Sequence, residues 1–243
     1  MKYNQYSLRH ELKYYIPYAD YMAMRGRLAA FMRPDENMTM SGGYRVRSLY
    51  FDDAAFTNRW EKEAGVEKRS KTRVRVYDKS SRLIRLEKKI KVGQYIGKQS
   101  GVLQPREWEQ LLRGDPGFML RKDSDFFHQM FAEFKLRRLR PAVIVDYRRE
   151  AYVMRAGNVR VTFDHELQAA VGDFNLFSDA GLIHYNAYPP QMLTMEVKFD
   201  DFLPGTVRKL VRPYTARRSE ISKYVLCLRA LQREMQYSKG LVL

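Results

Sequence analysis

Several stretches of the chain alternate basic with apolar residues, and this pattern constrains the fold more than any other feature. In "KTRVRVYDK", residues 71–79, Arg73 and Arg75 fall on one face of a strand while Val74 and Val76 fall on the other. Like charges that lie directly across a sheet destabilise it. A sheet built from such strands therefore needs an anion on its basic face.

Four more stretches, 6–16, 82–92, 159–164 and 193–200, repeat the alternation. Their polar faces carry Arg9, Glu11, Lys13, Arg85, Glu87, Lys89, Lys91, Arg160, Thr162, Asp164, Thr194, Glu196 and Lys198. If the sheet closes, these faces meet in a lumen whose Arg, Lys and few carboxylates suit a chain of phosphates and a divalent cation. The alternative is an open sheet in which one charged face is simply solvated.

The charge of the whole chain agrees with an anionic partner. Lys and Arg total 44 against 28 acidic residues, a formal net charge of +16. Such an excess indicates nucleic acid, an anionic membrane surface, or a phosphorylated molecule or polymer, although it can also serve only solubility. The single cysteine, Cys227, excludes an internal disulfide and a cysteine-based zinc site. We expect a cytoplasmic protein without a signal peptide or membrane span, and leave peripheral membrane association open.

The 243 residues show no linker, so we expect a single domain over 1–243. Strands are predicted over 6–16, 44–53, 69–78, 82–92, 142–154, 159–164 and 193–200, with a short strand or loop over 93–101 and an irregular segment that includes Pro189. Helices are predicted over 19–33, 54–62, 105–113, 124–137, 205–213 and 219–236. Adjacent strands with short turns pair antiparallel. This predicts an α+β fold with about eight strands, enough for a barrel with helices packed outside.

The start of the last predicted helix is a second place for an anion. Ser219 or a nearby polar residue can cap this helix, whose apolar stripe includes Val225, Leu228 and Met235. Ser222 and Lys223 would then lie in its first turn, where free backbone N–H groups and the helix dipole favour phosphate. The alternative is an ordinary solvated first turn.

Seven motifs occur in a fixed order: "RHELKYYI", "KTRVRVY", "LEKKIK", "VDYRREAY", "VRVTFD", "MEVKF" and "SEISKY". In this order the chain, from about residue 6 to 237, resembles the VTC domain. That domain is the polyphosphate polymerase module of the vacuolar transporter chaperone and a triphosphate tunnel metalloenzyme. The resemblance implies a tunnel-shaped antiparallel barrel that transfers the γ-phosphoryl group of ATP onto polyphosphate with Mn²⁺ or Mg²⁺.

The resemblance also implies roles for individual residues. Those matched to catalytic positions are Lys13, Arg73, Arg75, Lys89 and Lys223. Those matched to phosphate-binding positions or lying beside them are Arg9, Lys91, Lys98, Tyr147, Arg149, Arg160, Lys198 and Ser222. The metal is expected on Glu196, with Glu87 and Glu11 as further candidates.

One departure bears on the reaction. Many tunnel enzymes begin with E-x-E-x-K, whereas this chain has Arg9, Glu11 and Lys13 at those positions, and fewer carboxylates favour a polymerase over a metal-rich hydrolase. A triphosphate or nucleoside-triphosphate hydrolase and a non-catalytic module for polyphosphate or RNA stay open. The sequence has no glycine-rich nucleotide loop, so side chains would hold ATP by its phosphates. Neither sequence-specific nucleic-acid binding nor an SPX domain is expected here.

Overall fold

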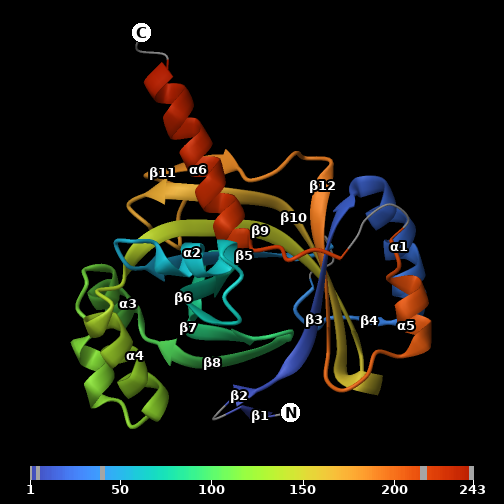
Figure 1. Cartoon of the computed structure of the whole chain (residues 1–243), viewed down its shortest axis with the longest axis horizontal. Coiled ribbons are helices and arrows are strands. Elements are labelled where there is room, and N and C mark those ends of the chain that lie inside the picture. The colour runs from blue at the N-terminus through green and yellow to red at the C-terminus, as the bar shows by residue number, and fades with distance from the viewer. Residues whose placement is uncertain (1, 4–5, 39–41, 214–217, 241–243) are drawn as a thin grey trace.

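The strands with alternating faces close into a barrel. In a computed structural model that describes residues 2–3, 6–38, 42–213 and 218–240, eight antiparallel strands pair in the order β10-β12-β3-β8-β7-β6-β5-β9 and return to β10 (Figure 1). They are β3 (Arg9–Pro17), β5 (Tyr44–Asp52), β6 (Lys68–Tyr77), β7 (Ser80–Val92), β8 (Tyr95–Leu103), β9 (Arg140–Met154), β10 (Val159–Gly172) and β12 (Met192–Phe199). The predicted α+β fold with an antiparallel barrel is confirmed.

Four short strands lie outside the barrel. β1 (Lys2–Tyr3) pairs with β2 (Tyr6–Ser7), β4 (Arg33–Pro34) pairs with β9, and β11 (Leu182–Asn186) pairs with β10. The segment predicted to be irregular before Pro189 therefore contains a strand, and residues 95–103 form a full strand of the barrel wall. Both were hard to recognise because neither has a regular apolar period of two.

The barrel has one short seam, between β3 and β8. Only two residue pairs join these strands, Arg9 with Ile96 and His10 with Tyr95, whereas β3 pairs with β12 along its whole length. Beyond His10 the two strands separate, and inward side chains of β3 and β7 meet instead: Lys89 Nζ donates to both carboxylate oxygens of Glu11. Charged side chains therefore complete the wall where backbone pairing stops.

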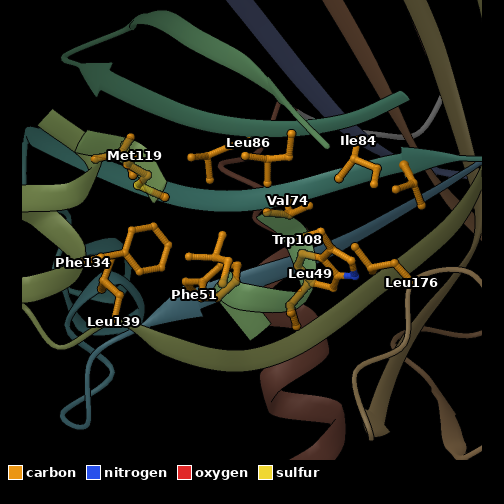
Figure 2. Close-up of a cluster of buried hydrophobic side chains, with 14 of the residues drawn as sticks. Leu49, Phe51, Val74, Ile84, Leu86, Trp108, Met119, Phe134, Leu139 and Leu176 are labelled. Atoms are coloured by element: carbon orange, nitrogen blue, oxygen red, sulfur yellow. The ribbon is translucent and has the colours of Figure 1, made fainter. Parts of the chain in front are cut away.

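Most helices cover the outer face of the barrel. The helices α3 (Pro105–Leu112), η1 (Gly117–Arg121) and α4 (Asp125–Leu136) pack on β5, β6 and β7. The buried side chains of this layer are shown in Figure 2 and include Leu49, Val74, Leu86, Trp108, Met119 and Phe134. A second layer, α1 (Tyr18–Phe31) and α5 (Gly205–Leu210), buries the outward side chains of β10 and β12. With both apolar layers outside, the polar strand faces are left for the interior.

The last helix, α6 (Lys223–Gly240), packs differently. Its first turns contact inward-facing side chains of β5 and β9, among them Val46, Tyr50, Val145 and Tyr147, and Tyr224 stacks on Tyr50 with ring centroids 5.1 Å apart. Farther along, α6 leaves the barrel (Figure 1). The N-terminus of α6 therefore forms part of the wall of the lumen, beside the short α2 (Thr57–Glu63).

The predicted start of α6 is wrong by four residues. The helix begins at Lys223, and the backbone N–H of Val225 donates to Ser222 Oγ at 3.4 Å, so Ser222 takes the capping place predicted for Ser219. The backbone N–H of Ser219 instead donates to the carbonyl of Lys13 at 2.9 Å. Met235, predicted in the buried stripe, is 58% exposed because α6 has by then left the barrel. No helix of the described ranges is long and apolar enough to cross a membrane.

Candidate phosphate-binding tunnel

A cavity of about 340 Å³ lies inside the barrel. Strands β3, β5, β6, β7, β9 and β12 contribute to its wall, and residues 218–223 close one side. The charged residues that line it include Glu11, Lys13, Lys62, Arg69, Lys71, Arg73, Arg75, Lys89, Lys91, Arg149, Glu196, Lys198, Arg218, Glu220 and Lys223. Side chains alternate between the two faces of each strand. In the register of this barrel, the residues of this list that lie on strands therefore all point inward.

Glu196 on β12 is the most heavily paired carboxylate of the lumen. It is 5% exposed and accepts from Lys223 Nζ at 2.6 Å and Lys198 Nζ at 2.8 Å, with Lys13 Nζ 3.6 Å away. Burial alone would raise the pKa of Glu196, but these lysines hold it well below its ordinary value. Glu196 is therefore a fixed negative charge at neutral pH.

Glu11 is held in the same way one strand away. Lys89 donates to it at 2.8 and 3.0 Å, and Lys13 and Lys198 lie within 3.5 Å of its carboxylate. Burial opposes the charge on Glu11, yet Lys13 and Lys89 lower its pKa. Burial lowers the pKa of Lys89 to about 7 despite its contact with Glu11. Lys89 is thus a cation that is only partly charged near neutral pH.

The arginine pair of β6 is anchored from the neighbouring strand. Arg73 Nε donates to Glu87 Oε2 at 2.8 Å, Arg75 lies 3.7 Å from the same carboxylate, and Lys98 Nζ donates to it at 2.7 Å. Arg75 also donates to Tyr147 Oη at 3.4 Å. Glu87 is fully buried and occupied on both oxygens, so it orients the two guanidinium groups toward the cavity.

A third network links β9, β10 and α6. Arg149 donates to both oxygens of Asp164, at 2.6 and 2.8 Å, and Lys223 Nζ lies 2.6 Å from Asp164 as well as from Glu196. Arg149 and Lys223 both lie over the ring of Tyr147. Burial lowers the pKa of Lys223, but Asp164 and Glu196 outweigh it and raise the pKa above its ordinary value. Lys223 is therefore a permanent cation at the N-terminus of α6.

At the mouth of the cavity three cations converge on one exposed carboxylate. Glu220, whose side chain is 60% exposed, pairs with Lys62 at 3.0 Å, Arg69 at 3.1 Å and Lys91. These cations come from α2, β6 and β7. They lower the pKa of Glu220 to about 2, mainly through its hydrogen bond from Lys91. Glu220 thus occupies, with one negative charge, the place where an anionic chain would meet the tunnel.

Lys71 differs from the other lysines of the lumen. Its Nζ donates to Ser222 Oγ at 2.7 Å and lies 5.0 Å from the ring centroid of Tyr224, and among the described residues no carboxylate pairs with it. Burial lowers the pKa of Lys71 well below its ordinary value, and the neighbouring cations Lys13 and Lys89 lower it further.

The structure brings most of the predicted site residues together, but four of them do not line the cavity. Among the described residues these are Arg9, Glu87, Lys98 and Arg160. Arg160 pairs with Asp35 and donates to Tyr44 Oη at 2.9 Å, toward the other end of β10. Lys98 stays close to the site through Glu87. Arg160 therefore does not share the cavity with Lys198 as predicted, although the two residues pair directly across β10 and β12.

The lumen carboxylates have the oxygen chemistry that Mg²⁺ and Mn²⁺ prefer. Within the described ranges no three His, Cys, Asp or Glu side chains gather as a ligand cluster. Lys198 Nζ lies between Glu196 and Glu11, at 2.8 and 3.5 Å. Mg²⁺ is commonly held by one or two carboxylates together with substrate phosphates. Glu196 and Glu11 fit such a partial site, provided that phosphate draws the lysines away.

The closed eight-stranded antiparallel barrel and its lumen of Arg, Lys and carboxylates are what the resemblance to the VTC domain implies. The family model described as VTC domain matches residues 8–232, and the chain belongs to this family. No curated protein sequence matches the chain.

Solved structures resemble the chain at low sequence identity. A Hippeastrum protein, named as an adenylyl cyclase with a dominant triphosphatase activity, matches with a TM-score of 0.53 and 14% identity, over 91% of this chain and 95% of that chain. A Bacillus halodurans protein named as an adenylate cyclase matches with a TM-score of 0.49 and 10% identity, over 96% of this chain and 90% of that chain. At this level of identity the Hippeastrum match shows the fold alone.

Proposed function

We propose that the chain is a polyphosphate polymerase that transfers the γ-phosphoryl group of ATP onto a polyphosphate chain inside the tunnel. The observation that carries this proposal is the pairing of four carboxylates in or beside the lumen, Glu11, Glu87, Asp164 and Glu196, with Lys or Arg. Carboxylates with lowered pKa are poor general bases for water. A terminal phosphate is already anionic at neutral pH and needs no base.

The cationic side chains supply what phosphoryl transfer asks of a protein, which is in-line placement and neutralisation of charge. Arg73 and Arg75 offer planar pairs of N–H donors to phosphate oxygens, and Lys223 adds a point charge beside the N-terminus of α6. When a phosphate enters, these groups exchange Glu87, Glu196 and Asp164 for substrate oxygens. The acceptor and the transferred group are thereby held against the same wall.

Mn²⁺ or Mg²⁺ would bind at Glu196, with Glu11 beside it, and bound there it would neutralise charge on the phosphate oxygens. Lys198 and Lys13 already occupy the space between these carboxylates and would move toward the phosphates. The residues of this chain thus determine how much positive charge surrounds the phosphates with and without the ion. ATP, triphosphate and polyphosphate are the partners that this charge distribution favours.

The test is to incubate the purified protein with ATP and Mn²⁺ or Mg²⁺, resolve polyphosphate on a gel, and measure free phosphate in parallel. We expect polyphosphate in the wild-type protein and none in Arg75→Ala. Release of free phosphate without polyphosphate would establish the hydrolase instead. Tight triphosphate binding without turnover in any divalent metal would establish a binding module.

A further inference from the structure

Ser222 and Lys71 form a hydroxyl–amine pair inside the tunnel that the proposed polymerase does not require. The two polar atoms, Oγ and Nζ, lie 2.7 Å apart, and both residues line the cavity. A serine hydroxyl becomes a nucleophile when an adjacent group can accept its proton. The pair therefore raises the question of whether Ser222 reacts with the phosphates that the tunnel holds.

The two tyrosine hydroxyls of the lumen contact groups that cannot act as bases. Tyr50 Oη accepts from Arg73 at 2.7 Å, and Tyr147 Oη accepts from Arg75 at 3.4 Å. A guanidinium stays protonated in proteins, so neither tyrosine has a proton acceptor there. Ser222 contacts an amine, and an amine that has lost its proton has a free lone pair.

The surroundings of Lys71 favour the neutral amine. Burial disfavours a positive charge on Lys71. The surrounding cations disfavour it further, and they are Lys13, Lys89, Arg69 and Lys62. Among the described residues no carboxylate forms an ion pair that would offset them. Lys13 and Lys89, by contrast, each pair with Glu11.

We propose that Ser222 is a phosphoryl acceptor activated by Lys71, so that the chain phosphorylates itself in the tunnel. This rests on the proposed use of ATP. Ser222 Oγ attacks the γ-phosphorus and an Oγ–P bond forms. The bond between the γ-phosphorus and the β–γ bridging oxygen breaks, and its electron pair leaves with ADP. The hydroxyl proton passes to Lys71 Nζ, which becomes an ammonium beside the new phosphate.

The product would be stabilised where it forms. Ser222 directly precedes the 18-residue helix α6, where free backbone N–H groups and the helix dipole favour a phosphoserine. Protonated Lys71 then lies within ion-pair reach of it. Lys13, whose Nζ donates to the carbonyl of Ile221 at 3.2 Å, adds a second cation to the same turn.

The experiment incubates the whole chain with ATP and Mn²⁺, without added phosphate or polyphosphate, and maps phosphopeptides after an acid quench. We expect one phosphoryl group on Ser222 in the wild-type protein. Ser222→Ala removes it, whereas Ser81→Ala, at an exposed serine near the start of β7 and outside the cavity lining, keeps it. Lys71→Arg keeps a cation that cannot lose its proton, so we expect labelling to fall about 100-fold, as for loss of a general base. Calorimetric titration with triphosphate checks that this variant is folded and binds.

The outcomes separate this inference from the proposed polymerase. Polyphosphate synthesis with no phosphoryl group on Ser222 would overturn the inference and leave the polymerase. Labelled Ser222 with no polyphosphate would support the inference and refute the polymerase. Equal labelling in Lys71→Arg and the wild-type protein would overturn the role of Lys71, and absence of both products would overturn both proposals.

Discussion

Replacing Glu196 by Gln tests the charge balance of the tunnel most directly. The substitution keeps the size of the side chain but removes the charge that Lys223 and Lys198 contact at 2.6 and 2.8 Å. Lys13 and Arg149 lie at 3.6 and 3.7 Å and lose the same partner. We expect the variant to be less stable than the wild-type protein in phosphate-free buffer because buried cations are left without compensation.

The expected size follows from the burial of Glu196, which is 5% exposed. Breaking a buried ion pair costs about 3–5 kcal/mol, and in a domain of this size each kcal/mol shifts Tm by about 2–4 °C, so Tm should fall by about 10 °C. Because the folded protein lowers the pKa of Glu196, the stabilisation is present at neutral pH and lost in acid. The difference between variant and wild type should therefore shrink below about pH 4.

Thermal unfolding followed by circular dichroism, with and without triphosphate, measures both effects. Triphosphate at about 100 times its Kd adds about 2.7 kcal/mol to either protein, and it should bind the variant more tightly because one negative charge has left the lumen. Glu63→Gln is the matched control, since Glu63 pairs with Arg59 and Arg229 at the surface. Equal Tm losses in the two variants would refute the buried network.

Turnover of the same variant tests the metal. If Glu196 holds Mn²⁺ or Mg²⁺, Glu196→Gln should bind triphosphate yet lose metal-dependent turnover. Full turnover in a folded variant would show that the metal lies elsewhere and that Glu196 serves only to balance charge.

Three further predictions concern binding. Arg75→Ala should weaken triphosphate binding about 10- to 100-fold, since a charged hydrogen bond contributes about 1.5–3 kcal/mol, while Arg82→Ala, at an exposed residue near the start of β7, should leave calorimetric affinity unchanged. Glu220→Gln should strengthen polyphosphate binding by about fivefold or less, because it frees partly exposed cations at the mouth; weaker binding would contradict this placement. Triphosphate binding at pH 8 should take up protons, because burial lowers the pKa of Lys89 to about 7 and a bound anion raises it. Calorimetry in two buffers of different ionisation enthalpy measures this uptake, which Lys89→Met should reduce.

Much of the fold was predictable because the barrel strands alternate so regularly. In β6 the apolar face with Val74 and Val76 packs under the outer helices. The opposite face, with Arg73 and Arg75, points into the lumen, as the alternation predicted. The start of α6 was not predictable in the same way, since Ser219 and Ser222 are equally good caps by composition. In the structure the backbone N–H of Ser219 donates to the carbonyl of Lys13 in β3, which leaves Ser222 as the cap.

Most of the predicted residues do line the candidate cavity, but the sequence did not show how they pair. The sequence predicted a basic lumen with a few carboxylates but not which residues pair, whereas the register places Arg73 opposite Glu87 and Lys13 opposite Glu196. Register depends on how the whole barrel closes, which no single strand encodes.

Residues that sequence reasoning missed fall into two kinds. Lys71 carried a signal, because it shares a strand face with the predicted residue Arg73, and Asp164 was placed on the polar face of its strand but given no role in the site. Glu220 and Lys62 carried none, since they reach the mouth from a loop and from α2, and only tertiary packing brings them to Arg69.

The carboxylates of the lumen also bear on how a polymer could move through it. A phosphate that binds Arg73 or Lys223 displaces Glu87, Glu196 or Asp164, so each new contact replaces one of similar charge and geometry. Binding free energy per phosphate is then a difference between two paired states rather than the full attraction of a bare cation. If the proposed polymerase moves its product along the tunnel, such exchange would keep any one phosphate from being held too tightly to advance. A lumen with the same cations but without these carboxylates would bind polyphosphate more tightly and release it more slowly.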